Sequence, residues 1–265
     1  MNKAEKTSHV RSVERALRLM GLLAEVGGEV SLTEIAERLQ WPKSTVHGIL
    51  ATLRDYRFVD QSTHNGRYRL GIRLFEFGHM VARNWDIREI ALPIMKKLNK
   101  QFGETVQLAT EDADEVFYIE KIDSTHILRI VSEIGVRLPM HCSALGKAML
   151  AFRSSSEVRR ILSRNGMRRM TGHTITNPET MDAELIKIRK QGYAVDDQEI
   201  MEGLRCIAAP IRDKNGDVRY AVSISSLAER LSGDYFERIK KVLIESAAEI
   251  SRLMGYKEPG RASDN

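Results

Sequence analysis

The chain has 265 residues, of which 42% are hydrophobic and 29% are charged, and its formal net charge is +5. This length accommodates one large or two ordinary domains, and the composition is that of a globular protein with a packed core. No apolar run approaches the roughly 20 residues that cross a bilayer. The polar start, Met-Asn-Lys-Ala-Glu-Lys, has no apolar signal core behind it. We therefore expect no membrane association and a cytoplasmic location.

The basic excess is concentrated near the start of the chain. Residues 1–82 carry 12 Lys and Arg against 9 Asp and Glu, whereas residues 83–265 carry 29 against 27. A mild local excess suits contacts with phosphate groups, but it is too small for a protein that binds nucleic acid through charge alone. If the chain binds DNA, its affinity has to rely on base contacts and on the symmetry of a dimer.

The chain has two cysteines, Cys142 and Cys206, which is too few for a fold stapled by disulfides. No Cys/His cluster has the spacing of zinc ligands, and the adjacent pair His141-Cys142 makes a poor chelate. We expect no metal ion and no cofactor.

The first predicted elements are two amphipathic helices. Residues 10–26 form a helix that ends at Gly27-Gly28, and its apolar stripe consists of Val13, Ala16, Leu17, Met20, Leu22 and Leu23. A capping box, Ser31-Leu-Thr-Glu34, starts the second helix. Its apolar residues recur at helical spacing and give it one buried face: Leu32, Ile35, Ala36 and Leu39.

A third helix follows after a short turn. Pro42 suits its first turn, because an N–H there would have no partner. The helix runs from Lys43 to Arg54, and its inner side carries Val46, Ile49, Leu50 and Leu53. From Arg38 to Arg54 the chain has no carboxylate, so the outer side of this helix is polar and basic.

A small β-hairpin is predicted after the third helix. Two strand-like segments, residues 58–61 and 67–70, flank Asn65-Gly66, the favoured pair for a two-residue hairpin turn. The order helix, turn, helix, hairpin predicts a winged helix-turn-helix that reads DNA in the major groove. A helical module for protein contact is the alternative. The predicted DNA-contacting residues are Arg11, Ser31, Lys43, Ser44, Thr45, His47, Thr52, Arg67 and Arg69.

The rest of the chain changes from helical to mixed patterning. A stiff helix is predicted over residues 72–84 and another over 87–102. Predicted strands cover residues 105–109, 116–122, 127–132, 206–211 and 218–225, with an acidic turn at 112–115 and a hairpin signal at Asn215-Gly216. Predicted helices cover residues 144–152, 157–165, 178–191 and 235–254. Hairpins with clustered helices predict an α+β domain, in which helices pack on an antiparallel sheet.

Three segments of this second part hold small polar groups among apolar ones. A helix that begins near Ser143 leaves the amides of Ala144 and Leu145 free to receive a carboxylate or phosphate. Residues 193–199 supply aspartates and lead to Cys206, and Ser223 and Ser225 share one face of a strand. Together they predict a pocket for a small organic acid. Each piece also has an ordinary role, as a helix cap, a buried thiol or a solvated hydroxyl.

An enzymatic function is the rival interpretation. His141, Cys142, Ser143 and the pair Asp196-Asp197 are ingredients of a hydrolase, and these aspartates with Glu199 are candidates for acid–base or metal chemistry. However, there is no Gly-x-Ser-x-Gly elbow, and adjacent residues cannot easily form a nucleophile and its base. We therefore predict that the protein is not an enzyme. A structural DNA-bridging protein without a ligand is a third possibility.

Specific motifs along the chain resemble one protein family. They are Ser12-Val-Glu-Arg-Ala-Leu, Leu32-Thr-Glu-Ile-Ala, Pro42-Lys-Ser-Thr-Val-His, Tyr68-Arg-Leu-Gly, the Ala-Leu-Gly-Lys core within residues 139–151, and Gly203-Leu-Arg-Cys-Ile-Ala-Ala-Pro. From about Val10 to Tyr256 the chain resembles the IclR-type bacterial transcription regulators. Residues 118–124 and Leu128-Arg are similar to its KdgR-like branch, which responds to a ketodeoxy sugar acid.

The resemblance implies a winged helix-turn-helix domain over residues 1–71, a linker helix over 72–86, a GAF-like effector domain over 87–256 and a disordered tail over 257–265. It also implies a homodimer, or a dimer of dimers, on a palindromic operator in double-stranded DNA. It further implies repression of a catabolic operon that a keto or sugar acid relieves, with activation as the alternative. The effector contacts that the resemblance implies are Ile130, Met140, Ala144, Leu145, Asp196, Leu204, Cys206, Ser223 and Ser225.

The sequence departs from the family pattern at two positions. Gly48 stands where the recognition helix often carries arginine, which removes an expected DNA contact and lowers helix propensity by about 1 kcal/mol. Arg57 replaces a common glycine before the wing, where it could add a phosphate contact. Both departures bear on which operator sequence is read.

Overall fold

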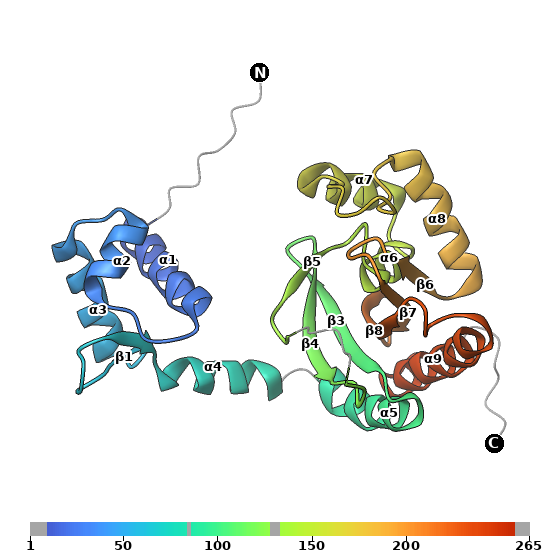
Figure 1. Cartoon of the computed structure of the whole chain (residues 1–265), viewed down its shortest axis with the longest axis horizontal. Helices are drawn as coiled ribbons and strands as arrows, with labels where there is room; N and C mark the ends of the chain where they lie inside the picture. Colours follow the sequence, from blue (N-terminus) through green and yellow to red (C-terminus); the bar gives the residue numbers. More distant parts are fainter. Residues whose placement is uncertain (1–9, 84–85, 128–132, 258–265) are drawn as a thin grey trace. The chain divides into compact units, whose positions relative to one another are not determined.

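The computed structural model describes residues 10–83, 86–127 and 133–257. The chain divides into two compact units, residues 1–84 and 85–265, and each has a hydrophobic core of its own (Figure 1). Within the described ranges, no helix combines the length and the apolar character needed to pass through a bilayer.

The N-terminal unit is a winged helix-turn-helix. Its elements in chain order are α1 (Arg11–Val26), α2 (Leu32–Leu39), α3 (Lys43–Asp55), β1 (Val59–Gln61), β2 (Tyr68–Leu70) and α4 (Ile72–Arg83). The predicted capping box is confirmed: Ser31 Oγ accepts from the Glu34 amide at 3.2 Å, and Glu34 Oε2 accepts from the Ser31 amide at 2.8 Å. Pro42 is the N-cap residue of α3 rather than part of its first turn.

The buried stripe of α1 differs from the predicted one. Leu19 is fully buried and packs with Leu22 and Leu23, whereas Val13 and Leu17 are more than half exposed. The prediction is confirmed for Leu22 and Leu23, which are buried, and for Ala16 and Met20, which pack against the core. It was wrong for Val13 and Leu17, because both sides of this helix carry apolar residues and periodicity alone does not separate them. An apolar stripe of α1 is thus left at the surface of the unit.

The two Asn-Gly hairpins form, but neither has the expected two-residue turn. Ser62 N donates to Arg67 O at 2.8 Å, so the wing has a four-residue loop in which Gly66 alone adopts a positive φ, 69°. The loop at Asn215-Gly216 has three residues, because Asp213 N donates to Asp217 O at 2.9 Å. The two-residue turn occurs instead at Ala113-Asp114, where both φ angles are positive, 53° and 67°.

The C-terminal unit is built on an antiparallel sheet whose two faces are covered by helices. Within the described residues the strand order is β5-β4-β3-β8-β7-β6, with all neighbours antiparallel. The strands are β3 (Thr105–Asp112), β4 (Glu115–Ile122), β5 (Arg137–Pro139), β6 (Ala194–Asp197), β7 (Leu204–Arg212) and β8 (Val218–Leu227). The helices are α5 (Asp86–Phe102), α6 (Ala144–Leu150), α7 (Ser155–Asn165), α8 (Pro178–Gln191) and α9 (Gly233–Leu253).

Alternation along the strands separates the two cores of this unit. Val106 and Leu108 point toward α5 and α9, whereas Gln107 and Ala109 point toward α6. The α+β class and the antiparallel sheet are therefore confirmed. The predicted strand at residues 127–132 falls mostly outside the described residues, and Ile127 itself is exposed and lies in no strand. The predicted disordered tail also lies outside the described residues from position 258 onward.

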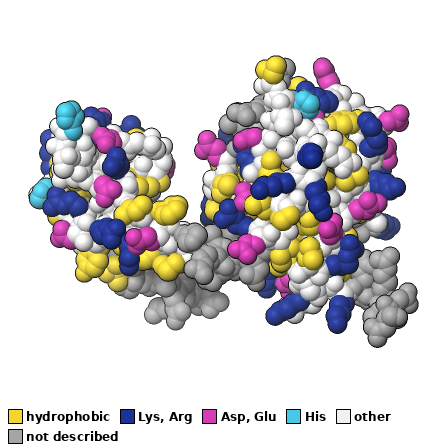
Figure 2. Space-filling model, turned by 90° about the horizontal axis from the view of Figure 1, so that it is seen from below, with side chains coloured by type: hydrophobic (Ala, Val, Ile, Leu, Met, Phe, Trp, Pro, Cys, Tyr) yellow, Lys and Arg dark blue, Asp and Glu magenta, His cyan; other side chains and the backbone are white. Residues whose placement is uncertain are grey.

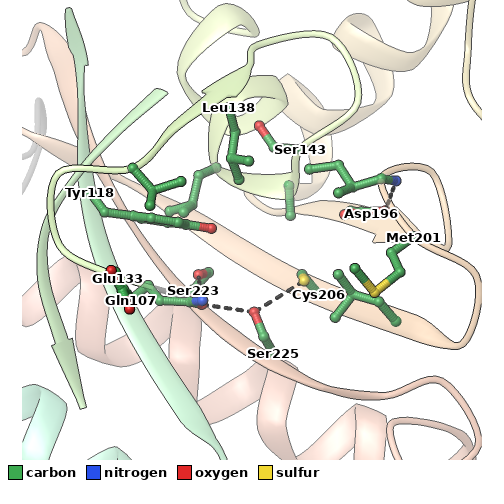
Figure 3. A pocket seen from close by; sticks show the side chains of 15 residues that line it. Gln107, Tyr118, Glu133, Leu138, Ser143, Asp196, Met201, Cys206, Ser223 and Ser225 are labelled. Carbon is green, nitrogen blue, oxygen red and sulfur yellow. Dashed lines mark hydrogen bonds between the residues drawn. The ribbon is translucent and has the colours of Figure 1, made fainter. Parts of the chain in front are cut away.

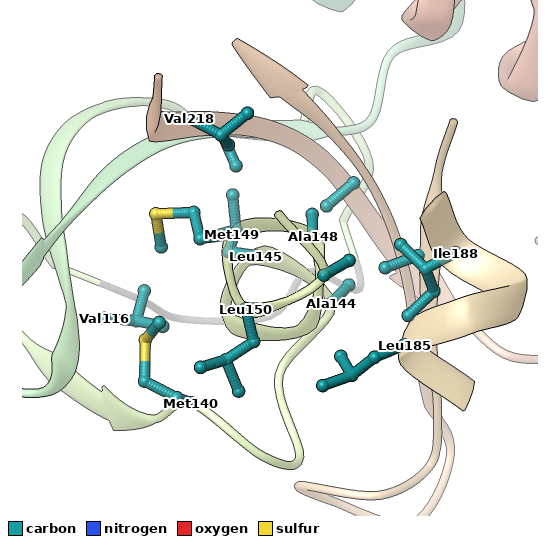
Figure 4. Packing of buried hydrophobic residues seen from close by; sticks show 14 of the residues in the cluster. Val116, Met140, Ala144, Leu145, Ala148, Met149, Leu150, Leu185, Ile188 and Val218 are labelled. Atoms are coloured by element: carbon teal, nitrogen blue, oxygen red, sulfur yellow. The ribbon is translucent and has the colours of Figure 1, made fainter. Parts of the chain in front are cut away.

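Helix α6 is the centre of the second core, and all seven of its residues are buried (Figure 4). It packs between the sheet, which contributes Val218, and helix α8, which contributes Leu185 and Ile188. Gly146 permits this position, because a Cβ there would lie 2.3 Å from the Met140 carbonyl oxygen. A glycine is therefore required where α6 passes the segment that leads into it.

Arg57 has a backbone conformation that explains why glycine is common at its position. Its φ is 64°, in the left-handed region that favours glycine, at the turn between α3 and β1. Its guanidinium lies 3.6 Å from Glu76 Oε1 of α4, and the side chain of Arg73 pairs with the same carboxylate. The arginine thus connects the turn to α4, whereas its expected phosphate contact stays a prediction.

The two helical glycines Gly146 and Gly48 provide a matched test of this packing. We expect Gly146→Ala to destabilise the C-terminal unit by about 1–3 kcal/mol, the usual cost of overpacking. Gly48→Ala should stabilise the N-terminal unit by about 0.5–1 kcal/mol, because a Cβ at Gly48 meets no atom within 4 Å. Thermal or urea unfolding, followed by circular dichroism, measures both changes. Equal effects of the two substitutions would contradict the close approach at Gly146.

Candidate functional site

A cavity of about 330 Å³ lies between the α6-facing side of the sheet and the start of α6 (Figure 3). Its walls come from strands β3, β4, β6, β7 and β8, from the segment before α6 and from the loop after β6. The lining residues are Gln107, Tyr118, Glu133, Val136, Leu138, Ser143, Ala144, Leu145, Asp196, Ile200, Met201, Leu204, Cys206, Ser223 and Ser225.

Strand register produces a polar row along the floor of the cavity. Asp196 of β6 is paired with Cys206 of β7, which in turn is paired with Ser225 of β8. Gln107 Oε1 accepts hydrogen bonds from Ser225 Oγ at 2.7 Å and from Ser223 Oγ at 3.0 Å. These side chains share one face because residues two apart on a strand point the same way.

The start of α6 forms the opposite wall. Ser143 is the N-cap: its Oγ accepts from the Gly146 amide at 3.0 Å and donates to the Pro139 carbonyl oxygen at 2.9 Å. The first amides of a helix have no carbonyl partner within the helix. Ala144 and Leu145, which carry such amides, both line the cavity.

A buried ion pair lies behind this wall. The Lys147 ammonium of α6, 1% exposed, pairs with Glu199 Oε1 in the loop after β6. The Glu199 amide donates at 2.7 Å to Oδ1 of Asp196, which is also 1% exposed. Among the described residues, Asp196 Oδ2 is a buried oxygen without a hydrogen-bond partner.

Burial dominates the ionisation of the groups around the cavity. It raises the pKa of Asp196 to about 7, with a further contribution from the Glu199 carboxylate, while the Glu199 amide and Lys147 oppose the shift. Burial also raises the pKa of Tyr118 and of Cys206 well above their ordinary values. Both are therefore neutral hydrogen-bonding groups near pH 7.

The arrangement does not suit the hydrolase ingredients noted in the sequence. Burial raises the pKa of the Cys142 thiol to about 12, so it is no nucleophile. His141 Nε2 is bonded to the Arg168 carbonyl oxygen at 3.0 Å, and Ser143 is engaged as a helix cap. No group of three or more His, Cys, Asp or Glu side chains in the described part of the chain is arranged to hold a metal ion.

Seven of the nine predicted effector residues line the cavity, namely Ala144, Leu145, Asp196, Leu204, Cys206, Ser223 and Ser225. Met140 does not: it is buried in the core around α6, beside Leu150 and Val116 (Figure 4). Its assignment to an apolar wall of the pocket is therefore corrected. Ile130 lies outside the described residues.

Sequence reasoning missed much of the lining, including Gln107, Tyr118 and Leu138. Gln107 gave a usable signal, since it is a polar residue flanked by the apolar residues Val106 and Leu108 in a predicted strand. Tyr118 and Leu138 gave none, because their place depends on the order of the strands in the sheet.

The predicted DNA-contacting residues of α3 lie on its solvent side. Lys43, Ser44 and His47 are exposed near its start, and Thr45 is half-buried. Thr52 is also exposed, but it lies nine residues beyond Lys43, or about 13 Å along the helix, and its hydroxyl donates to the Gly48 carbonyl oxygen. Arg11 is exposed at the first position of α1.

Three other predicted DNA contacts are engaged within the protein. Ser31 is occupied by the capping box. The wing arginines pair with acids: Arg67 donates to Glu34 Oε2 at 2.7 Å, and Arg69 lies 3.5 Å from Glu29 Oε1. These pairs are partly exposed, so they hold the wing against α2 and the segment before it only weakly. Phosphate contacts by Arg67 and Arg69 would have to displace Glu34 and Glu29.

An aromatic contact supports the start of α3. The guanidinium groups of Arg15 and Arg18 lie 5.6 Å and 5.4 Å from the centre of the Trp41 ring, in the turn just before this helix. This contact places two further basic groups beside the turn that leads into α3. The sequence analysis did not single them out, although their spacing places both on the same side of α1.

Two family models match the chain. The model described as "IclR helix-turn-helix domain" matches residues 12–63, and the model "Bacterial transcriptional regulator IclR C-terminal" matches residues 79–252. The regulator KdgR of Escherichia coli is 37% identical over 258 residues, which are 97% of this chain and 98% of that protein. The transcriptional repressor IclR of Escherichia coli is 35% identical over 254 residues, which are 95% of this chain and 93% of that protein.

Solved structures agree with these matches over both units. The Thermotoga maritima IclR structure has a TM-score of 0.80 and 35% identity, and the match covers 94% of this chain and all of that one. An IclR homologue from Microbacterium hydrocarbonoxydans, complexed with 4-hydroxybenzoate, has a TM-score of 0.81 and 26% identity, over 92% of this chain and 98% of that one.

The buried carboxyl of Asp196 makes the stability of the protein depend on pH. Its pKa of about 7 lies above the ordinary value of an unfolded aspartate. The unfolded chain therefore ionises first, and this group's contribution to stability is lost as pH rises from about 4 to about 7. Asp196→Asn has no carboxyl to ionise, so its free energy of unfolding does not suffer this loss. The stability gained by the variant over the wild type should therefore be larger at about pH 8 than at about pH 5, by about 2 kcal/mol, or roughly 5 °C in Tm.

Differential scanning calorimetry at the two pH values measures this effect. Asp197→Asn is the matched control, because Asp197 is exposed and paired with Arg205. A benefit from Asp196→Asn that is the same at both pH values would contradict the raised pKa.

Proposed function

Because the chain belongs to the IclR family of bacterial transcriptional regulators, we propose that it represses a catabolic operon and that a small organic acid releases it. Members of this family are regulators of transcription and not enzymes. The observation that carries the proposal is the pairing, in one chain, of a winged helix-turn-helix with a separate unit that contains a polar-floored cavity. The first reads DNA and the second senses a metabolite, in the cytoplasm.

The cavity favours a small acid that carries further oxygens. Its volume of about 330 Å³ suits a small organic molecule. We infer that the amides of Ala144 and Leu145 hold the carboxylate, because both residues line the cavity at the start of α6; the buried oxygen of Asp196 that lacks a hydrogen-bond partner among the described residues supports a ligand there. The oxygens of Ser223 and Ser225, whose protons are donated to Gln107, suit hydroxyl groups of the ligand, and the thiol of Cys206 suits a further ligand oxygen. A keto acid or a sugar acid has this chemistry, and the likeness to KdgR favours a ketodeoxy sugar acid.

We infer that the protein acts as a homodimer on a palindromic operator, or as two such dimers. Apolar side chains are exposed on α1 and α4 of the N-terminal unit, among them Leu17, Ile72 and Met80. In Figure 2, hydrophobic side chains reach the surface of both units between charged ones. Pairing through α1 and α4 would cover these side chains and bring two copies of α3 to successive major grooves.

The effector would act by favouring one arrangement of the subunits. A ligand shifts such a balance only by its different affinity for the two arrangements. Helix α4, which follows the wing without a break, would carry the change to the spacing of the two recognition helices. An acid that binds better to the arrangement with misplaced recognition helices would relieve repression.

The DNA-reading role predicts a loss of operator affinity on substitution of α3. We expect Lys43→Ala with Thr45→Ala to weaken binding to a selected operator at least tenfold, and to lower the salt dependence of a dimer by about 2 phosphate equivalents. Gel shifts at several salt concentrations, with operator DNA obtained by in vitro selection, provide the measurement. Lys187→Ala is the control, since Lys187 lies exposed on α8. Unchanged gel shifts would remove α3 from DNA recognition.

The sensing role predicts that a bulky residue in the cavity prevents the acid from binding, so that the repressor stays on the operator when acid is added. Leu138 lines the cavity, and Leu138→Phe should abolish the heat of binding an acid and its release from the operator, while binding to DNA without acid persists. Calorimetry against pyruvate, gluconate, a ketodeoxy sugar acid and 4-hydroxybenzoate tests the wild type first. Ile186→Phe, on the exposed side of α8, is the control. Absence of binding by every acid would refute the sensing role.

A further inference from the structure

The charges around the cavity do not match an anionic ligand. The charged side chains that line it, within the described residues, are Asp196 and Glu133, and both are acidic. The nearest cation, Lys147, lies behind the wall and is already paired with Glu199. A carboxylate that enters therefore meets like charge unless one of these groups takes up a proton.

Asp196 is the group placed to take up that proton. Its Oδ1 accepts from the amides of Glu199 at 2.7 Å and Ile200 at 3.4 Å, whereas its Oδ2 is buried and unpartnered among the described residues. It lies next to Cys206 in the polar row on the cavity floor (Figure 3). With a proton on Oδ2, the Asp196 side chain would become a hydrogen-bond donor at this point of the cavity.

The count of charges leads to the same group. Lys147, Glu199 and Asp196 carry one positive and two negative charges when all are ionised, and the ammonium pairs with Glu199 rather than with Asp196. The bound acid would add a third negative charge beside Asp196, whose side chain is buried. Coulomb repulsion in such a place is far stronger than in water, so protonation of the uncompensated carboxylate becomes favourable.

The other groups that face Asp196 do not take over this role. Burial raises the pKa of Glu199 as well, and its Oε2 is buried without a hydrogen-bond partner among the described residues, but its Oε1 is paired with the Lys147 ammonium, which favours the charged form. Tyr118 of β4 and Cys206 of β7 are buried groups that stay neutral near pH 7, because their pKa values are raised. The same holds for Cys142 before α6, whose pKa is about 12. Glu133 lies at the cavity wall but in an exposed position, where water stabilises its charge.

We propose that this cavity takes up its acid together with one proton, which Asp196 Oδ2 carries and donates to an oxygen of the ligand. The inference rests on the proposed function, in which an acid occupies this cavity. The proton comes from solvent, and no covalent bond changes. The site then selects monocarboxylates with a hydroxyl, keto or carboxylate oxygen within reach of Asp196, and it discriminates against dianions.

The pH dependence of acid binding follows from the ionisation of Asp196 in the ligand-free protein. Burial raises its pKa to about 7, so the proton is already present below that pH and has to be taken from solvent above it. The affinity for the acid should be level below about pH 6 and should then fall, approaching tenfold per pH unit above about pH 8. Between about pH 6.5 and about pH 8.5 we expect the Kd to rise roughly 25-fold.

Isothermal titration calorimetry of the full chain tests this proposal. The probe is whichever of pyruvate, gluconate, a ketodeoxy sugar acid or 4-hydroxybenzoate binds most tightly to the wild type. Titrations at about pH 8 in phosphate and in Tris, which differ in ionisation enthalpy, give the number of protons taken up per site. We expect a value near 1 for the wild type, by the same linkage.

Two matched variants make the result specific. Asp196→Asn keeps a donor at this position but cannot titrate, so proton uptake should vanish and the Kd should become independent of pH, within about threefold of the wild-type value at low pH. Asp197→Asn should behave as the wild type, because Asp197 is exposed and paired with Arg205. Unchanged operator binding by both variants confirms that they fold.

Each outcome decides between the proposals. An acid that binds without proton uptake, or proton uptake that persists in Asp196→Asn, overturns the proton proposal and leaves the sensing role intact. If none of the acids binds to the wild type, the proposed sensing role fails and the proton proposal fails with it.

Discussion

The buried pair between Lys147 and Glu199 is the interaction on which the C-terminal unit and its cavity depend. It joins α6, whose first residues form one wall of the cavity, to the loop after β6, which forms another. Removal of one partner from a buried pair typically costs about 3–5 kcal/mol, because the other charge remains without water or counter-ion. The threonine hydroxyls of Thr171 and Thr174 donate at 2.7 Å to the carbonyl oxygens of Gln198 and Glu199, respectively, which fixes the same loop from outside.

The same pair explains why the cavity is acidic. Because the Lys147 ammonium is paired with Glu199, the carboxyl of Asp196 has backbone amides as partners but no cation of its own. Burial raises the pKa of this carboxyl to about 7, so the group is close to half ionised at neutral pH. Packing and the proposed ligand chemistry are thus linked: the lysine that orders the wall pairs with Glu199, and Asp196, which has no cation of its own, is the group that carries the proton in our proposal.

The N-terminal unit uses charge differently. Its recognition helix is free of acids over most of its length, whereas Glu29 and Glu34 lie beside the wing and pair with its arginines. Exposed pairs of this kind contribute little to stability, and salt weakens them further. In the proposed complex, DNA phosphates would therefore have to compete with Glu29 and Glu34 for the wing arginines. Trp41, with Arg15 and Arg18 beside it, supports the start of the recognition helix from within the protein.

The sequence by itself determined the local elements and the type of protein. The capping box at Ser31, the helix end at Gly27 and the span of α8 follow from short-range hydrogen bonding and periodicity, which need no distant partner. Only the tertiary structure decided which face of α1 is buried, where the two-residue turn falls and which polar residues meet. Asp114 adopts its left-handed turn conformation where Arg160 binds its carboxylate and Asn165 binds its carbonyl, 46 and 51 positions away. Likewise, Gln107, Asp196 and Ser225 became one site through the order and register of strands, and neither is encoded by any single segment.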